Sequence, residues 1–403
     1  MAANLQELVE GLADRLDRSV AIDDARLHLL AHSPHRGQVD AARAESILRR
    51  AVSKEVVDHV YACADAAGER YVVTPRPELG LDDVRIGFPI RHHGALMGFL
   101  WLLGPEGDVD EENTDAATRS AAEAAVILHR EHLRSATARA REQDLVERLL
   151  GGDDSARADA ATAIREDGLF TASTYCVVVV DVERPGERTT DDDALAISEA
   201  VAAVRSRRGS RGVLSLQRRD HAVLIVAEPL ASGAREQLLA VGRSLREAVL
   251  AKTDAPHCRV GISRSRSDLA QARRGADEAA RAARIAGRVP TVEEVTGVEA
   301  LGVYELLDQV PDDALRAMVH PGLLSLMSQG ARTDSLVHTL EVFLDSAGDV
   351  KTASERLFAH RTSLYYRLRR IQELTGLDLS DGDDRLIAHL GLRIARLTGI
   401  HED

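Results

Sequence analysis

Near the end of the chain, cationic, aromatic and hydroxyl side chains gather on a short stretch that could hydrogen-bond to DNA. Between Lys351 and Thr375 there are six Lys or Arg residues and two acidic ones, which gives a local charge of +4 in a chain whose net charge is −14. Arginine presents paired N–H donors that fit guanine edges and phosphate oxygens. Because the chain as a whole is acidic, DNA binding must come from a local patch of this kind.

Two predicted helices joined by a tight turn position these side chains. The first helix is expected from about Val350 to Leu357, and either Asp349 or Thr352 can cap it. The second is expected from about Arg361 to Thr375, and Gly376 is a natural C-terminal stop. A basic second helix entered through a tight turn is what a helix-turn-helix places in the major groove.

The second helix divides into a buried stripe and an exposed surface. Four residues recur at helical spacing and form the expected core stripe: Leu364, Leu368, Ile371 and Thr375. The residues predicted to bind DNA are His360, Arg361, Thr362, Ser363, Tyr365, Tyr366, Arg369 and Arg370. An ordinary solvated basic helix is the alternative, because pairs of helices joined by short turns are common.

One pattern within the stretch from about Leu336 to Leu397 is distinctive: Ala353…Leu357…His360-Arg-x-x-Leu-x-Tyr-Arg-Leu-x-x-Ile371…Thr375-Gly376. It resembles the C-terminal helix-turn-helix of the PucR/CdaR family of bacterial transcription regulators. Members typically carry His-Arg-Asn-Thr at the turn, whereas this chain has His360-Arg-Thr-Ser363 and so keeps the hydroxyl but loses the amide. The resemblance implies a double-stranded DNA operator as partner. It also implies a helix-turn-helix domain over residues 333–403.

Composition restricts the class of protein. The 403 residues are 44% hydrophobic and 29% charged, which is typical of globular domains, and the length favours two to four of them. Three isolated cysteines give no disulfide framework and no metal motif, so we expect a reducing compartment, no bound metal and no cofactor. No signal peptide or membrane-spanning stretch is apparent, and a cytoplasmic location is therefore expected.

Residues 1–135 have the pattern of an α/β domain. The expected helices are 4–16, 42–51, 54–64 and 116–133, and the expected strands are 19–23, 27–32, 70–74, 83–90 and 96–103, with a hairpin loop at His92-His-Gly94. With Val20-Ala-Ile-Asp-Asp24 and Gly98-Phe-Leu-Trp101 among the matching pieces, the order resembles a GAF domain, a sensor of small molecules.

That resemblance implies a small-molecule effector. The polar residues that the sequence places best to orient it are His32, His35, Arg43, Arg91 and His92. A metal site at these histidines is disfavoured, because neither cysteine nor regularly spaced carboxylate joins them. The alternative is that the domain serves dimerisation only.

A helical linker is predicted over residues 136–165, as part of a long helix over 118–150 that Gly151-Gly152 interrupts. This helix either pairs with a second copy of the chain or is a solvated linker. Since one helix-turn-helix reads only a short half-site, we expect a homodimer or a higher homo-oligomer.

Residues 166–288 alternate as β-α-β-β-α-β-α and resemble the degenerate GGDEF-like domain of the same family, a relative of nucleotide cyclases. Two-metal phosphoryl transfer needs paired carboxylates and glycines that let phosphate approach. Asp181 occupies the position of one metal ligand. The turn that should read Gly-Gly-Asp/Glu-Glu-Phe is Gln217-Arg-Arg-Asp-His221, so we expect no catalytic residues and no enzyme activity.

Residues 289–332 are expected to form a helical connector with short helices over 302–310 and 312–318. A helix over 335–346 should precede the helix-turn-helix, and a last helix over 383–397 should follow it. On that last helix, one apolar face is expected from Leu386, Leu390, Ile394 and Leu397.

The sequence thus predicts a multidomain protein of α/β and all-α parts: a GAF-like sensor, a GGDEF-like domain and a C-terminal helix-turn-helix. The function predicted is that of a dimeric, effector-responsive transcription regulator. The rival interpretations are a cyclic-dinucleotide signalling enzyme and an interaction adaptor that does not bind DNA. Heparin retention with strong salt dependence would favour DNA binding.

Overall fold

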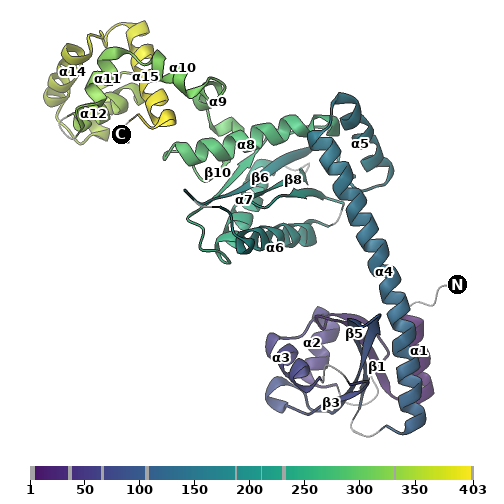
Figure 1. The fold of residues 1–403 in the computed structure, drawn as a ribbon. Helices are drawn as coiled ribbons and strands as arrows, with labels where there is room; N and C mark the ends of the chain where they lie inside the picture. The colour runs from purple at the N-terminus through teal and green to yellow at the C-terminus, as the bar shows by residue number, and fades with distance from the viewer. Residues whose placement is uncertain are drawn as a thin grey trace. The chain divides into compact units, whose positions relative to one another are not determined.

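The structure, a computed structural model, describes residues 5–34, 39–64, 68–104, 109–186, 188–209, 211–228, 233–330 and 333–400 (Figure 1). The chain divides into two compact units, Met1–Ala140 and Arg141–Asp403. Within the described ranges, no helix combines the length and the apolar character needed to cross a membrane.

The first unit is built on a five-stranded antiparallel sheet of order β2-β1-β5-β4-β3. Its strands are β1 (Ser19–Asp24), β2 (Leu29–His32), β3 (Tyr71–Val73), β4 (Arg85–His92) and β5 (Ala95–Leu103). Its helices are α1 (Leu5–Leu16), α2 (Ala41–Arg49), α3 (Lys54–Cys63) and the long α4 (Glu111–Gly151), with a 3-10 turn η1 (Pro77–Leu79). The β4–β5 hairpin turns at His93-Gly94, where the sequence predicts it.

Alternation along the strands gives this sheet two apolar faces. Ile22, Phe88 and Leu100 pack in one core cluster with α1 and the first half of α4. The neighbouring residues Phe99 and Trp101 belong to a second cluster, which includes residues of α2 and α3. These two helices cover the face of the sheet opposite α1 and α4 (Figure 1). The sheet is therefore covered on both sides.

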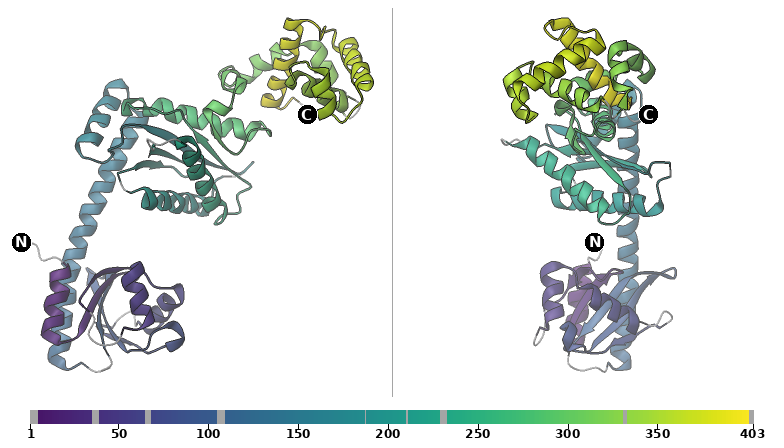
Figure 2. Two further views of the ribbon diagram at one scale, coloured as in Figure 1. Left: turned by 180° about the vertical axis from the view of Figure 1, so that it is seen from behind. Right: turned by 90° about the vertical axis from the view of Figure 1, so that its left-hand side faces the viewer.

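The second unit contains another five-stranded sheet, of order β10-β9-β6-β8-β7. Its strands are β6 (Tyr175–Glu183), β7 (Val213–Gln217), β8 (His221–Ala227), β9 (His257–Ile262) and β10 (Val295–Gly297). The helices α6 (Asp191–Arg208) and α7 (Ala234–Leu250) cover one face. The opposite face carries α5 (Asp154–Glu166), η2 (Leu269–Gln271), α8 (Ala272–Arg288) and the end of α4 (Figure 2).

Two segments of this unit differ from the sequence prediction. The segment 136–165 is helical, as expected, but its part from Leu145 onward is no solvated linker, since Leu145, Leu149 and Ile164 are buried against the second sheet. The connector 289–332 is not wholly helical, because it supplies β10, which pairs in parallel with β9. Because only three residues pair, the strand is too short to show an alternating pattern in the sequence.

The remaining described residues are mostly helical, and α11, α12 and α13 pack against α14. After η3 (Val298–Ala300) come α9 (Val303–Leu307), α10 (Asp312–Met318), α11 (Pro321–Met327), α12 (Asp334–Asp345), α13 (Val350–Arg356), α14 (Arg361–Thr375) and α15 (Gly382–Thr398). Residues of α11, α12, α14 and α15 share one core cluster, to which α8 contributes Ile285. Helix α11 is absent from the sequence prediction, which ends the connector without it.

The predicted apolar face of the last helix is partly wrong. Ile394 and Leu397 are buried, but Leu386 is 57% exposed. The buried side of α15 starts instead at Ala388 and continues through Leu392. Helical spacing alone admits both stripes, and the small residues Ala388 and Gly391 decide the choice because they let α15 approach its neighbours closely.

Candidate DNA interface and ligand sites

The helix-turn-helix has well-formed helix ends. Asp349 accepts a hydrogen bond of 2.7 Å from the backbone N–H of Thr352, so of the two predicted caps of α13 Asp349 is the one used. Helix α14 begins after His360, whose Nδ1 accepts from the N–H of Thr362 at 3.3 Å. At its other end Gly376 adopts the left-handed conformation, as the sequence predicts. These caps fix where the exposed face of α14 begins and ends.

The core stripe of α14 is confirmed, since Leu364, Leu368, Ile371 and Thr375 are its buried residues. The structure brings the predicted DNA-binding residues together on α14 and its cap, and each of them is exposed. These residues are His360, Arg361, Thr362, Ser363, Tyr365, Tyr366, Arg369 and Arg370. Tyr365 and Tyr366 are 60% and 74% exposed, which is unusual for aromatic residues held only for packing.

The arginines of α14 differ in how they are held. Arg369 lies 3.4 Å and Arg370 3.1 Å from the same carboxylate, that of Glu373. Arg361 is bound to no acidic partner among the ion pairs of the described residues. Arg367, which the sequence prediction leaves out, donates to the hydroxyl of Thr339 at 3.3 Å and so ties α14 to α12.

Phe358 lies in the turn between the two helices, and the sequence prediction assigns it no role. Its side chain is 98% exposed, and its φ of 48° lies in the left-handed region that side chains disfavour. It stands two residues before the cap of α14. The available signal was a large apolar residue inside a predicted tight turn.

Helix α11 supports α14 through a close backbone approach. A Cβ atom at Gly322 would lie 2.1 Å from the carbonyl oxygen of Thr375 and 2.7 Å from its carbonyl carbon. Only glycine fits there, because the neighbouring atoms belong to the backbone and cannot move aside. This packing sets the position of the C-terminal end of α14.

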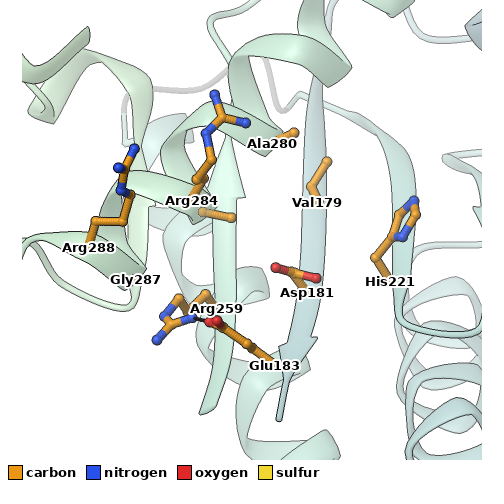
Figure 3. Close-up of a pocket in the computed structure, with 10 residues that line it drawn as sticks. Val179, Asp181, Glu183, His221, Arg259, Ala280, Arg284, Gly287 and Arg288 are labelled. Carbon is orange, nitrogen blue, oxygen red and sulfur yellow. Dashed lines mark hydrogen bonds and ion pairs between the residues drawn. The ribbon is translucent and has the colours of Figure 1, made fainter. Parts of the chain in front are cut away.

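The second unit has a cavity of about 450 Å³ that is lined by residues of β6, β8, β9 and α8 (Figure 3). Asp181 lies on β6, opposite His221 of β8 and Arg259 of β9. Burial raises the pKa of Asp181 above its ordinary value. The turn before β8 supplies one acidic residue, Asp220, whose carboxylate lies 2.7 Å from the ring of His221.

The cationic groups around this cavity already have partners. Arg259 is paired with Glu183, Arg284 with Asp308 of the segment after α9, and Arg288 with Asp312 at the start of α10. In the ranges that the structure describes, no three His, Cys, Asp or Glu residues are grouped so as to hold a metal ion. The cavity is thus lined by ion pairs that also fasten α9 and α10 to α8.

Of the five predicted effector residues, the four that the structure describes contact different parts of the first unit. His35 lies outside the described residues. His32 stays beside α1, where Gln6 donates to its carbonyl at 2.9 Å. Arg91 donates to the carbonyl of Gly94 in the hairpin turn, and His92 stacks on His129 of α4 at 3.9 Å between ring centroids. Arg43 alone is buried, being 3% exposed. The contacts of these four residues therefore show no shared site.

Arg43 instead belongs to a buried polar cluster that the sequence prediction missed. We call Asp23, Arg43, Tyr71, Arg85 and Trp101 the α2 cluster. All five carry a buried polar side-chain atom without a hydrogen-bond partner: Asp23 Oδ1, Arg43 Nε and Nη2, Tyr71 Oη, Arg85 Nε and Trp101 Nε1. Their positions at 23, 43, 71, 85 and 101 give no local pattern, and only the sheet brings them together.

The electrostatics of the α2 cluster follow from its burial. Burial raises the pKa of Asp23 to about 6, although Arg43, Trp101 and Arg85 all favour its ionised form. The indole N–H of Trp101 is close enough to have this effect without forming a hydrogen bond of ordinary geometry. Arg85 is held by Asp40, the cap of α2, through contacts of 2.8 and 2.9 Å.

Comparison with known proteins gives two matched regions. Residues 336–394 match the PucR C-terminal helix-turn-helix domain, and residues 150–285 match the GGDEF-like domain. Together they include the α14 surface and the cavity beside Asp181.

Three curated relatives are similar to the chain. The DNA-binding transcriptional activator AdeR of Bacillus subtilis is 21% identical over 98% of this chain and 93% of its own length. The proline-responsive transcriptional activator PutR of the same organism is 21% identical over 98% and 97%. The purine catabolism regulatory protein of Bacillus subtilis is 35% identical over 24% of this chain and 18% of its own.

Proposed function

We propose that this chain, a DNA-binding regulator of the PucR family, reads operator DNA in the major groove through α14 as a dimer whose DNA affinity responds to a small effector. The observation that carries the proposal is the surface of α14. It exposes eight polar, basic and aromatic residues along one helix whose other face is fixed in a core.

The order of residues on α14 supports base contacts near its start and phosphate contacts further along. In a helix-turn-helix, the N-terminal residues of the second helix meet base edges. Arg361, Thr362 and Ser363 occupy that position, and Tyr365 lies one turn further on the exposed side. Arg369 and Arg370 come two turns later, where contacts to phosphates are expected.

A cyclic-dinucleotide signalling enzyme is the weaker alternative. The cavity beside Asp181 is lined by guanidinium groups in ion pairs, and its turn has neither glycines nor two acidic residues. We expect no cyclic product when the protein is incubated with nucleoside triphosphates and magnesium. Turnover that disappears in Asp181→Ala would show that the cavity is an active site.

A genome-wide map of the DNA bound in living cells tests the proposal. We expect a small set of sites that share a motif with two half-sites about one helical turn apart, or a multiple of it. The double variant Arg361→Ala/Arg370→Ala should lose these sites, and Arg49→Ala, an exposed arginine of the first unit, should retain them. Binding without a shared motif would contradict a sequence-specific regulator.

A further inference from the structure

We propose that the α2 cluster is the effector site and that it recognises a small zwitterion bearing neighbouring ammonium and carboxylate groups, the α-amino acid class. The inference rests on the proposed function, since it assigns the sensing role to the first unit and names the chemistry of what is sensed.

The first support is the concentration of unsatisfied polar atoms. More than nine in ten buried polar groups of folded proteins have a hydrogen-bond partner. Of the eight buried side-chain atoms without one in the described residues, six lie in the α2 cluster. Leaving such a group unpaired destabilises the folded state, so six of them in one place favour a ligand that pairs with them.

The second support is the orientation of α2. A helix on a protein surface normally buries its apolar side chains. Helix α2 buries Ala42, but it also buries the polar residues Arg43 and Ser46 at 3% and 4% exposure while Leu48 is 84% exposed. The helix therefore directs a guanidinium toward the sheet at the expense of hydrophobic burial.

The third support is the character of the unpaired atoms. Arg43 and Arg85 offer guanidinium N–H donors, which suit the two oxygens of a carboxylate. Asp23 offers one acceptor, which suits an ammonium group. A ligand with only an anionic group would leave Asp23 unpaired, and a simple amine would leave the guanidinium donors unpaired. A zwitterion satisfies both sets.

The fourth support is the apolar wall beside these atoms. The chain has only twelve Trp, Tyr and Phe residues in all, yet Tyr61, Tyr71, Phe99 and Trp101 form one cluster here. Their ring centroids are 5.6–5.8 Å apart. An aromatic surface can pack against a ligand's hydrocarbon part and attract its ammonium group.

Binding to the full-length protein tests this site directly. Each proteinogenic L-amino acid is screened by thermal shift, and any that raises the melting temperature is measured by isothermal titration calorimetry without DNA. We expect at least one to bind. Its deaminated carboxylic acid and its carboxamide, used as matched probes, should each bind at least tenfold more weakly.

Two substitutions on α2 test whether binding depends on the buried arginine in particular. Arg43→Gln should abolish binding, whereas Arg49→Gln, an exposed arginine of the same helix, should leave it unchanged. Asp23→Asn is a second test if Arg43→Gln fails to fold by circular dichroism, and it should weaken binding of the amino acid more than binding of the deaminated acid.

The proposal is overturned if no amino acid binds, if the deaminated acid binds equally well, or if Arg49→Gln is as damaging as Arg43→Gln. DNA binding is tested independently of the effector role. It is measured by retention on heparin and on mapped operator DNA in the absence of amino acid. An amino acid that binds without changing operator affinity would overturn the sensing role.

Discussion

The arginines of α14 are expected to make different contacts with DNA, because they differ in their ion pairs within the protein. Arg361, at the start of the helix, has no ion pair with any described residue, whereas Arg369 and Arg370 share Glu373. A guanidinium already close to a carboxylate is suited to a diffuse phosphate contact more than to a directed pair of bonds with one base.

Arg361→Ala should weaken operator binding by about 1–3 kcal/mol and relax the preference at one base pair. Arg369→Ala and Arg370→Ala should weaken binding to all sequences alike and reduce the salt dependence of affinity. Fluorescence anisotropy over a range of salt concentrations measures both effects, with Arg49→Ala as control. Equal operator affinity for the wild type and Arg361→Ala would refute the assignment of Arg361 to a base.

Asp23 gives the first unit a distinct dependence on pH. The pKa of Asp23 is about 6 in the folded chain, against an ordinary value of 3.8, so the folded state holds its proton more tightly than the unfolded state. The stability that protonated Asp23 contributes to the folded state is therefore complete below about pH 4 and is lost as pH rises through about 6. The pKa of Asp23 is lowered by the neighbouring Arg43, Arg85 and Trp101 and is raised by Asp24.

The measurement is the free energy of unfolding of the wild type minus that of Asp23→Asn, from urea titrations at several pH values. We expect this difference to fall by at most about 3 kcal/mol between pH 4 and pH 7. A difference that stays constant would show that Asp23 is not buried as described.

At the scale of elements, sequence periodicity predicted most helices and strands, because long amphipathic segments carry a clear signal. The buried stripe of α14 and the β4–β5 hairpin are examples. What it missed were short pieces held by tertiary contacts, such as β10 and α11. The residues proposed to bind DNA lie on one continuous helix and its cap, so the sequence could group them. The α2 cluster draws on five separate segments, so the sequence could not.

Helix α11 should matter for DNA binding although it exposes no DNA-binding residue that the sequence predicts. Gly322→Ala would force its methyl group against the backbone of Thr375 and should cost about 1–3 kcal/mol of stability, with a loss of operator affinity as α14 shifts. Gly382→Ala in α15 is the control, because no atom lies within 4 Å of a Cβ there. Urea unfolding and anisotropy follow the two effects, and equal behaviour of both variants would contradict the packing argument.

At the scale of the whole molecule, the acidic net charge opposes binding to DNA, and one short helix contacts few base pairs. Two copies binding two half-sites overcome both limits. We expect light scattering to give twice the chain mass of 43.7 kDa, free and on operator DNA. A monomer under both conditions would contradict the proposed dimer.

The pairing of β10 with β9 affects how the chain can be cut and how it is made. The GGDEF-like match ends at residue 285, before β10, so a fragment trimmed to that match would leave β9 as an open sheet edge. Open edges recruit strands from other molecules. Fragments should therefore extend past Gly297 to stay soluble. On the ribosome, the second sheet is completed only after Val295–Gly297 has emerged, by which time α8 is available to cover it.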